Sequence, residues 1–168
     1  MTPVNIRPEA EIRVAAESAF KEHRQRVLKV LSSALVEHVG STSIPGALTK
    51  GDVDLLVRVE AGRFEAAIAA LRRLYVVNQR ENWTPTYASF AEAEATAVPV
   101  GVQLAVVGSA DEALFTSFRD ALIRDPALLA EYNALKLRHD GEGYERYTKV
   151  KGEFVERVLA DATQSSPR

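Results

Sequence analysis

Residues 37–55 read EHVGSTSIPGALTKGDVDL, and they join a turn of small residues to a strand that carries two carboxylates. The β-branched and apolar residues 52–59 predict a central strand. Because side chains alternate along a strand, Asp52 and Asp54 point to the same face. Bulky apolar residues follow Asp54 directly, which indicates burial on both faces, where unpaired carboxylates are costly unless a cation or hydrogen bonds compensate.

The two acids and the preceding turn predict a site for a metal ion and a phosphate. Asp52 and Asp54 are the expected catalytic and metal-binding residues, because paired carboxylates suit Mg²⁺ or Mn²⁺. Gly40 and Ser41 offer a backbone that phosphate can approach closely, with an N–H donor and a hydroxyl. Thr42 or Ser43 could cap a short helix whose positive end favours anions. Lys50 is a further candidate for phosphate contact.

Each of these features also has a simpler interpretation. Asp52 and Asp54 could be edge-strand acids that face solvent, and Gly40-Ser41 could be an ordinary turn between a strand and a helix. A lysine in a loop is usually solvated. His38 and Glu37 should face opposite sides of their strand, and a histidine beside a core strand is more often hydrogen-bonded within the structure than a ligand.

The remaining segments predict an α+β fold, in which a mixed sheet of about four or five strands is flanked by helices and followed by a helical subdomain. Apolar spacing predicts helices at 8–35, 62–74, 110–124, 126–139 and 143–162. Extended segments are expected at 36–40, 52–59, 75–77, 86–90 and 100–107. We expect a single domain over 1–168, with an α/β core at 8–109, a helical part at 110–162 and a disordered tail at 163–168.

Composition sets outer limits on function. The 168 residues are 46% hydrophobic and 26% charged, enough for one domain with a core. The net charge of −2 gives no chain-wide positive field for nucleic acid, and no basic stripe is evident. The absence of cysteine excludes disulfides and thiolate chemistry. The first 25 residues lack a secretory pattern and no apolar run could span a bilayer, so we expect a cytoplasmic protein without a membrane partner.

A glycine–serine turn followed about ten residues later by Asp-x-Asp resembles the nucleotidyltransferase superfamily, in which the turn holds nucleotide phosphates and the acids hold metal. More narrowly, the chain resembles the GrpB family of small bacterial proteins over nearly its whole length. The residues that carry this likeness are the run 37–46, then Phe118-Arg119-Asp120, Asp125-Pro126, Tyr132, Leu135-Lys136, Tyr147 and Lys151. The resemblance implies a nucleotidyltransferase-like fold.

Several positions depart from the common GrpB pattern. Gly51 and Asp52 stand where many relatives have proline and an apolar residue, and this completes the Asp-x-Asp pair. Gln103-Leu104-Ala105 replaces a His-Leu-His strand, so nitrogen ligands are missing there. Gln103 also takes the place of the superfamily's third carboxylate, and an amide can bind or position water but cannot act as a base. Glu92 and Glu94 are candidates to supply the missing acid.

Other basic and aromatic residues are weaker candidates. Arg119, Lys136 and Lys151 could contact phosphate, although helical Arg and Lys mostly pair with neighbouring acids. Trp83 and Tyr87 could stack on a base or pack in the core.

The sequence thus predicts a metal-dependent nucleotidyltransferase that uses Mg²⁺ or Mn²⁺. It would transfer a nucleotidyl group from a nucleoside triphosphate, held at Gly40 and Ser41, to an acceptor. The sequence identifies neither the acceptor nor the oligomeric state. The alternative is a catalytically degenerate protein that binds a nucleotide or phosphometabolite. A third hypothesis is an interaction module built on the C-terminal helices.

Overall fold

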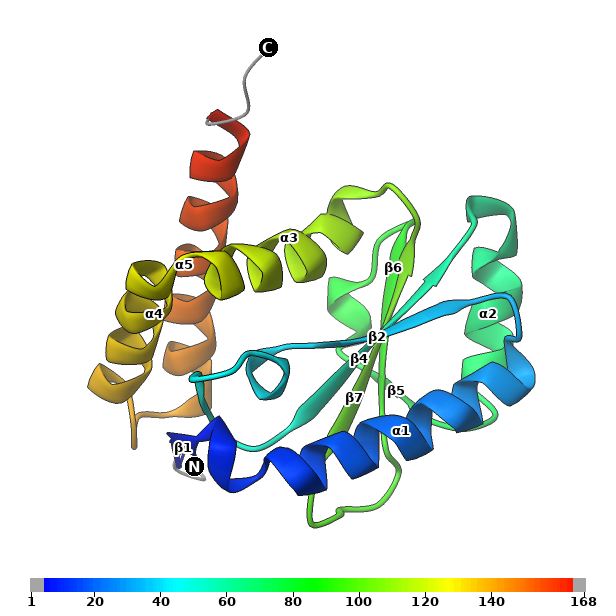
Figure 1. Cartoon of the computed structure of the whole chain (residues 1–168). Helices are drawn as coiled ribbons and strands as arrows, with labels where there is room; N and C mark the ends of the chain where they lie inside the picture. The colour runs from blue at the N-terminus through cyan, green and yellow to red at the C-terminus, as the bar shows by residue number, and fades with distance from the viewer. Residues whose placement is uncertain (1–4, 165–168) are drawn as a thin grey trace.

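A five-stranded mixed sheet forms the centre of the protein, seen in a computed structural model that describes residues 5–164 (Figure 1). The strand order is β2-β4-β7-β6-β5; β4 and β7 are parallel, and the other neighbours are antiparallel. These strands are β2 (Leu35–Val39), β4 (Val53–Val59), β5 (Val76–Asn78), β6 (Tyr87–Ala91) and β7 (Val100–Val106). The predicted α+β class and mixed sheet are confirmed.

The helices lie on both faces of the sheet. Helices α1 (Arg13–Val30) and α2 (Phe64–Leu71) cover one face, and α3 (Ala110–Arg124) crosses the other (Figure 1). Helices α4 (Pro126–Arg138) and α5 (Tyr144–Gln164) pack with α3 at one end of the sheet. Short 3₁₀ turns complete the chain: η1 (Glu9–Glu11), η2 (Ser41–Ser43), η3 (Ala61–Arg63) and η4 (Arg80–Asn82).

Strand β4 is buried on both faces, as its sequence predicts. Leu55 and Val57 pack into the core beneath α1 and α2, whereas Leu56 packs on the opposite side with Val39 and Ala105. Since β4 lies between β2 and β7, it is not an edge strand. The interpretation of Asp52 and Asp54 as edge-strand acids is therefore wrong.

A second core joins the C-terminal helices to the loop after β2. Ile44 and Ala47 from this loop pack with Tyr132, Leu135 and other buried residues of α3, α4 and α5. The side chain of Asn133 extends the contact, because it accepts from the Leu48 backbone N–H and donates to the Gly46 carbonyl. The helical part therefore holds the turn that contains the predicted phosphate cradle.

The N-terminal helix is shorter than predicted. Residues 8–35 are expected to be helical, but α1 covers only Arg13–Val30, and Leu35 begins β2. Pro8 lies instead in β1 (Arg7–Pro8), which pairs with β3 (Leu48–Thr49) in a small antiparallel sheet. Apolar spacing cannot reveal this pairing, because the paired residues lie 40 and 42 positions apart in the sequence.

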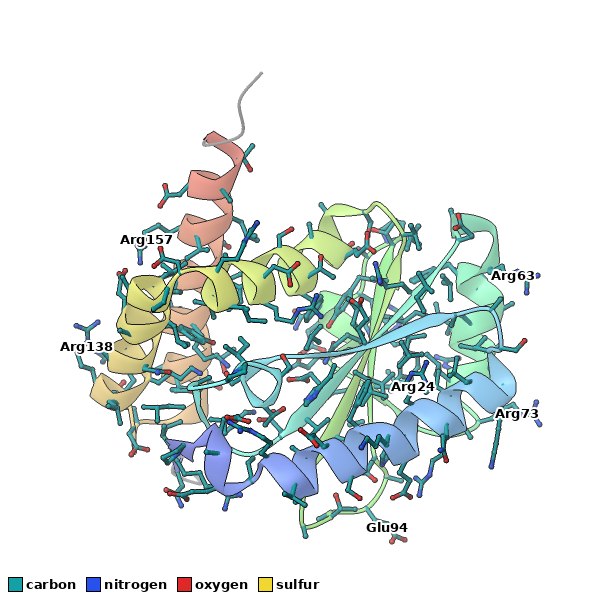
Figure 2. The ribbon with its side chains drawn as sticks, viewed as in Figure 1. Arg24, Arg63, Arg73, Glu94, Arg138 and Arg157 are labelled. Carbon is teal, nitrogen blue, oxygen red and sulfur yellow. The ribbon has the colours of Figure 1, made fainter. Side chains whose placement is uncertain are left out.

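The other elements agree with their predicted ranges to within a few residues at each end. Helix α5 runs to Gln164, so it includes two residues of the expected tail at 163–168, and residues 165–168 lie outside the described part of the chain. Within residues 5–164, no helix has the length and apolar character needed to cross a membrane. Figure 2 shows the charged side chains of Arg63, Arg73 and Arg138 projecting outward from the ribbon.

Candidate functional site

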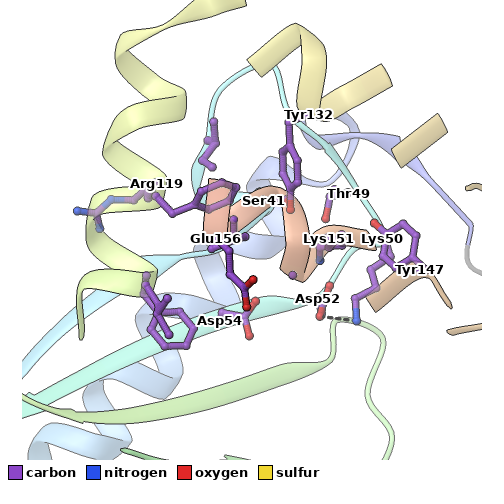
Figure 3. A pocket seen from close by; sticks show the side chains of 17 residues that line it. Ser41, Thr49, Lys50, Asp52, Asp54, Arg119, Tyr132, Tyr147, Lys151 and Glu156 are labelled. Atoms are coloured by element: carbon purple, nitrogen blue, oxygen red, sulfur yellow. Dashed lines mark ion pairs between the residues drawn. The ribbon is translucent and has the colours of Figure 1, made fainter. Parts of the chain in front are cut away.

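A cavity of about 380 Å³ lies between the sheet and the C-terminal helices, and both predicted carboxylates open onto it (Figure 3). Asp54 is in β4, and Asp52 immediately precedes that strand. The sheet side and the turn contribute Gly40, Ser41, Ile44, Thr49, Lys50, Asp52 and Asp54. The helices contribute Leu114, Phe115, Phe118, Arg119, Tyr132, Tyr147, Lys151, Gly152, Val155 and Glu156. The structure thus brings the acids and the glycine–serine turn to one site.

Two glycines make room for the carboxylate of Asp54. A Cβ atom at Gly40 would lie 2.6 Å from Oδ2 of Asp54, and one at Gly101 would lie 2.9 Å from Oδ1. Gly40 also has a φ of +74°, which a side chain would strain. Gly40 therefore has a second function besides the predicted approach to phosphate, because it lets the turn close over Asp54.

The electrostatic environment of Asp54 disfavours its charged form. Burial, followed by the nearby charge of Asp52, raises the pKa of Asp54 to about 6. Added positive charge at this point would be stabilising, since it would offset both effects. A carboxylate in this state is a suitable ligand for a divalent cation.

Gln103 is committed to holding Asp54. Its Nε2 donates to Oδ1 of Asp54 over 3.3 Å, and its Oε1 accepts from the Tyr87 hydroxyl over 2.5 Å. The amide oxygen thus faces Tyr87. Gln103 does not line the cavity and takes a supporting position behind Asp54.

Asp52 already has a basic partner. Its Oδ2 lies 3.0 Å from Nζ of Lys50, which is drawn as a dashed line in Figure 3. The described residues contain no group of three His, Cys, Asp or Glu side chains placed to hold a metal. The two carboxylates fit Mg²⁺ or Mn²⁺ as part of a ligand set that water and phosphate oxygens would complete.

Hydrogen bonds of the Thr42 side chain hold the turn after β2 in place. The Thr42 hydroxyl donates to the backbone carbonyl of Asp52 over 3.1 Å and lies 2.9 Å from Nε2 of His38. Thr42 is buried and does not line the cavity, so it ties the turn to β4 and is not placed to bind phosphate. His38 also stacks on Phe20 of α1, which agrees with its interpretation as a hydrogen-bonded structural residue.

Lys136, another predicted phosphate contact, is also buried and does not line the cavity. It is 0% exposed, and its Nζ donates to the Leu48 carbonyl and lies 2.6 Å from Oγ of Ser41. The ring centroid of Tyr132 lies 4.0 Å from the same nitrogen. Lys136 therefore reaches the cavity only through Ser41.

Arg119 and Lys151 are the basic side chains that the helices bring to the cavity. Arg119 donates to the backbone carbonyl of His38 over 3.2 Å and pairs with Asp120 over 2.9 Å. Nζ of Lys151 lies 5.2 Å from the ring centroid of Tyr147. The Arg119 guanidinium also pairs with Glu37 over 3.5 Å and points away from Asp52 and Asp54 in Figure 3, so the positive charge on the cavity side comes from Lys50 and Lys151.

The remaining candidates lie elsewhere. Glu92 is 3.3 Å from His23 on the α1 side of the sheet, and Glu94 is exposed, so neither joins Asp52 and Asp54. Trp83 packs against Phe90 in the core and donates to the Asn78 carbonyl. Tyr87 stacks on Phe115, which itself lines the cavity.

Aromatic side chains of the C-terminal helices line one side of the cavity, and the sequence did not predict this aromatic wall of Phe118, Tyr132 and Tyr147. Tyr132 and Tyr147 are both buried and line the cavity, and burial raises the pKa of Tyr147 to about 12. Their appearance in the helical part, far along the chain from Asp52, left no local pattern that could reveal this placement. Phe118 packs edge-on against Tyr132 and extends the same wall.

Comparison with known proteins identifies the family. The GrpB protein family model matches residues 10–161. The chain belongs to the GrpB family. A UPF0157 protein of Vibrio cholerae is 33% identical over 152 residues, which cover 90% of this chain and 80% of that protein. A UPF0157 protein of Deinococcus radiodurans is 32% identical over 148 residues, which cover 87% and 77%.

Solved structures extend the likeness to the fold. The conserved protein GrpB from Enterococcus faecalis matches with a TM-score of 0.76 at 22% identity and covers 95% of this chain and 98% of its own. The Cid1 poly(U) polymerase, solved with MgGTP bound, matches with a TM-score of 0.50 at 13% identity. That match covers 71% of this GrpB-family chain and 39% of the polymerase. The predicted nucleotidyltransferase-like fold is confirmed at this level.

Proposed function

We propose that this GrpB-family protein binds a nucleoside triphosphate as its Mg²⁺ or Mn²⁺ complex and transfers the nucleotidyl group to an acceptor. The observation that carries the proposal is the position of Asp54, which sits between Gly40 and Gly101 beside Asp52 on the cavity wall. The nucleotidyltransferase-like fold and the MgGTP of the Cid1 polymerase support the choice of ligand.

The residues divide into a metal-holding and a phosphate-holding group. Asp52 and Asp54 would hold the cation, which supplies charge neutralisation at the transferring phosphate. The Gly40 backbone and the Ser41 hydroxyl would hold the β- and γ-phosphates. Lys151 lines the same cavity and would offset the charge of the departing pyrophosphate.

Lys50 would change partners when the ligand binds. In the structure it pairs with Asp52, so its ammonium group lies close to the place where the cation would bind. A divalent cation at Asp52 would release Lys50 towards a phosphate oxygen. Asp52 would thus face a positive charge in both states, Lys50 in the ligand-free protein and the metal ion in the complex.

Calorimetry with ATP, GTP, CTP and UTP tests the binding half of the proposal. Each nucleotide is titrated with Mg²⁺ and again with EDTA, and Asp54→Asn is run beside the wild type. We expect Mg²⁺-dependent binding that Asp54→Asn removes while the protein stays folded, because the variant lacks a charged ligand. Equal affinity in the two proteins would contradict the proposal.

A second candidate is binding without transfer. It is favoured because the described residues place no third acid to hold a metal with Asp52 and Asp54, although Glu156 lines the same cavity, and because Gln103 serves as a support. Measuring pyrophosphate release across a panel of hydroxyl and phosphate acceptors separates the two functions. Nucleotide binding with no release above the Asp54→Asn background would favour the binding protein.

A further inference from the structure

A buried amine contacts the cavity serine in a way that nucleotide binding does not require. Lys136 is fully buried, and Oγ of Ser41 lies 2.6 Å from its Nζ. The Leu48 carbonyl and the face of Tyr132 are its other neighbours. Ser41 itself opens onto the cavity, so a small ligand there can reach the serine but not the lysine.

The surroundings of Lys136 suit a neutral amine. Burial and the charge of Lys151 lower its pKa to about 6, although Asp52 acts in the opposite direction. A neutral amine has two hydrogens and one lone pair. The charged amine donates to Oγ of Ser41 over 2.6 Å. Once neutral, it can point its two hydrogens to the Leu48 carbonyl and the Tyr132 ring, which leaves the lone pair to accept the Ser41 hydroxyl proton.

We propose that Ser41 is a nucleophile and Lys136 its general base, forming a serine–lysine dyad that takes a phosphoryl group from a phosphate ester or anhydride in the cavity. The bond from Ser41 Oγ to phosphorus forms as the bond to the leaving oxygen breaks. The leaving group departs with that electron pair, and the serine proton moves to Lys136 Nζ. This activity goes beyond the proposed function, since it modifies the protein itself and needs only the dyad and its access to the cavity.

The charges around the cavity favour phosphorus over carbonyl electrophiles. Lys151 lines the same cavity as Ser41 and would hold the anionic oxygens of a phosphoryl donor. The chain also contains a matched comparator. The hydroxyl of Ser43, two residues further along the turn, donates to the Gly40 carbonyl over 2.6 Å and does not line the cavity.

Labelling by diisopropyl fluorophosphate, followed by peptide mass spectrometry, tests the dyad without any nucleotide. The serine oxygen bonds to phosphorus, and fluoride leaves. We expect one adduct, on Ser41, formed faster as pH rises through about 6, where Lys136 loses its proton. Lys136→Met should slow labelling by roughly 10² or more, the usual contribution of a general base. Ser43→Ala should label like the wild type.

Two results would overturn the dyad: no adduct on Ser41, or equal rates in Lys136→Met and the wild type. If Lys136→Met does not fold, the wild-type pH profile decides, because a flat profile removes the base. Parallel incubations with MgATP and with acetyl phosphate identify the donor by phosphorylation at Ser41, and transfer from neither would overturn the phosphoryl chemistry. Nucleotide binding without labelling would leave the proposed function standing alone, and labelling without nucleotide binding would leave the dyad alone.

Discussion

Oδ2 of Asp54 lies 2.6 Å from the point where a Cβ at Gly40 would stand, so the turn and the acid fit only because residue 40 is glycine. The contact joins the two halves of the motif in residues 37–55. It fixes the distance between the predicted phosphate cradle and the predicted metal ligand. The first prediction follows from it.

Gly40→Ala should lower stability and nucleotide affinity together. The Gly40 backbone, with φ +74° and ψ −180°, lies in a region that residues with a Cβ avoid at a cost of about 1–3 kcal/mol, and the clash with Asp54 adds to it. Gly108→Ala is the matched control, since Gly108 has a φ of +77° and nothing within 4 Å of the added atom. Urea unfolding should show the larger loss for Gly40→Ala, and equal losses would mean that the Asp54 contact is unimportant.

Gly101→Ala tests the other side of the same carboxylate without backbone strain. An added Cβ would lie 2.9 Å from Oδ1 of Asp54 and 3.3 Å from Nε2 of Gln103. The substitution should lower unfolding free energy by roughly 1–3 kcal/mol, the usual cost of overpacking. In an Asp54→Ala background most of this loss should disappear, because the clashing oxygen is gone. A loss that persists in the double variant would assign it to another contact.

Asp54→Asn should stabilise the ligand-free protein at neutral and alkaline pH. The folded pKa of about 6 lies above the ordinary 3.8, so the native state binds the extra proton between these values. The stabilising effect of protonation is therefore present at low pH and is lost as pH rises through about 6. We expect the variant to exceed the wild type by an amount of order 1 kcal/mol at about pH 8. Thermal unfolding should show this gap closing towards about pH 4.

Lys136 should make stability depend on pH in the alkaline range. Its folded pKa of about 6 lies below the ordinary 10.5, so the unfolded chain binds more protons between these values. The wild type should therefore gain stability as pH rises from about 7 to about 9, by up to about 1.4 kcal/mol per pH unit from this group. Lys136→Met should flatten the dependence. An identical slope in both proteins, measured by urea unfolding, would show that the lysine stays charged.

Lys50→Met should raise the affinity of the nucleotide-free site for Mn²⁺. The substitution removes the cation that lies 3.0 Å from Asp52, so a metal ion no longer competes with it. We expect an increase of a few-fold, in keeping with a partly exposed ion pair. Electron paramagnetic resonance of free Mn²⁺ measures the change. Lower affinity in the variant would argue against a cation site at Asp52.

The central strand and the C-terminal helices could be predicted because their patterns are local. The apolar run after Asp54 indicates burial on both faces, and Asp125-Pro126 marks the boundary between α3 and α4. The pairing of β1 with β3 could not be predicted in this way. It sets Pro8 opposite Leu48 and Arg7 opposite Thr49, and this backbone pairing leaves no side-chain period in the sequence.

The candidate site was predictable in its acids and less so in its supports. Asp52, Asp54 and Gly40 lie close in sequence. Strand alternation places the two acids on one face, and the antiparallel pairing of β2 with β4 brings Gly40 beside Asp54. Thr42 and Lys136 are polar residues of the kind that bind phosphate, but the structure buries both against backbone carbonyls. Lys136 is placed by the packing of α4 on the turn, and Thr42 by its contacts with His38 and Asp52, so both depend on tertiary contacts.

Crystals grown with Mn²⁺ and a nucleoside triphosphate test the central claim most directly. Anomalous scattering locates the metal independently of the protein coordinates. We expect an anomalous peak bound by the carboxylates of Asp52 and Asp54, with triphosphate oxygens at Gly40 and Ser41. A nucleotide in the cavity with no metal at these acids, and with Lys50 still paired to Asp52, would contradict it.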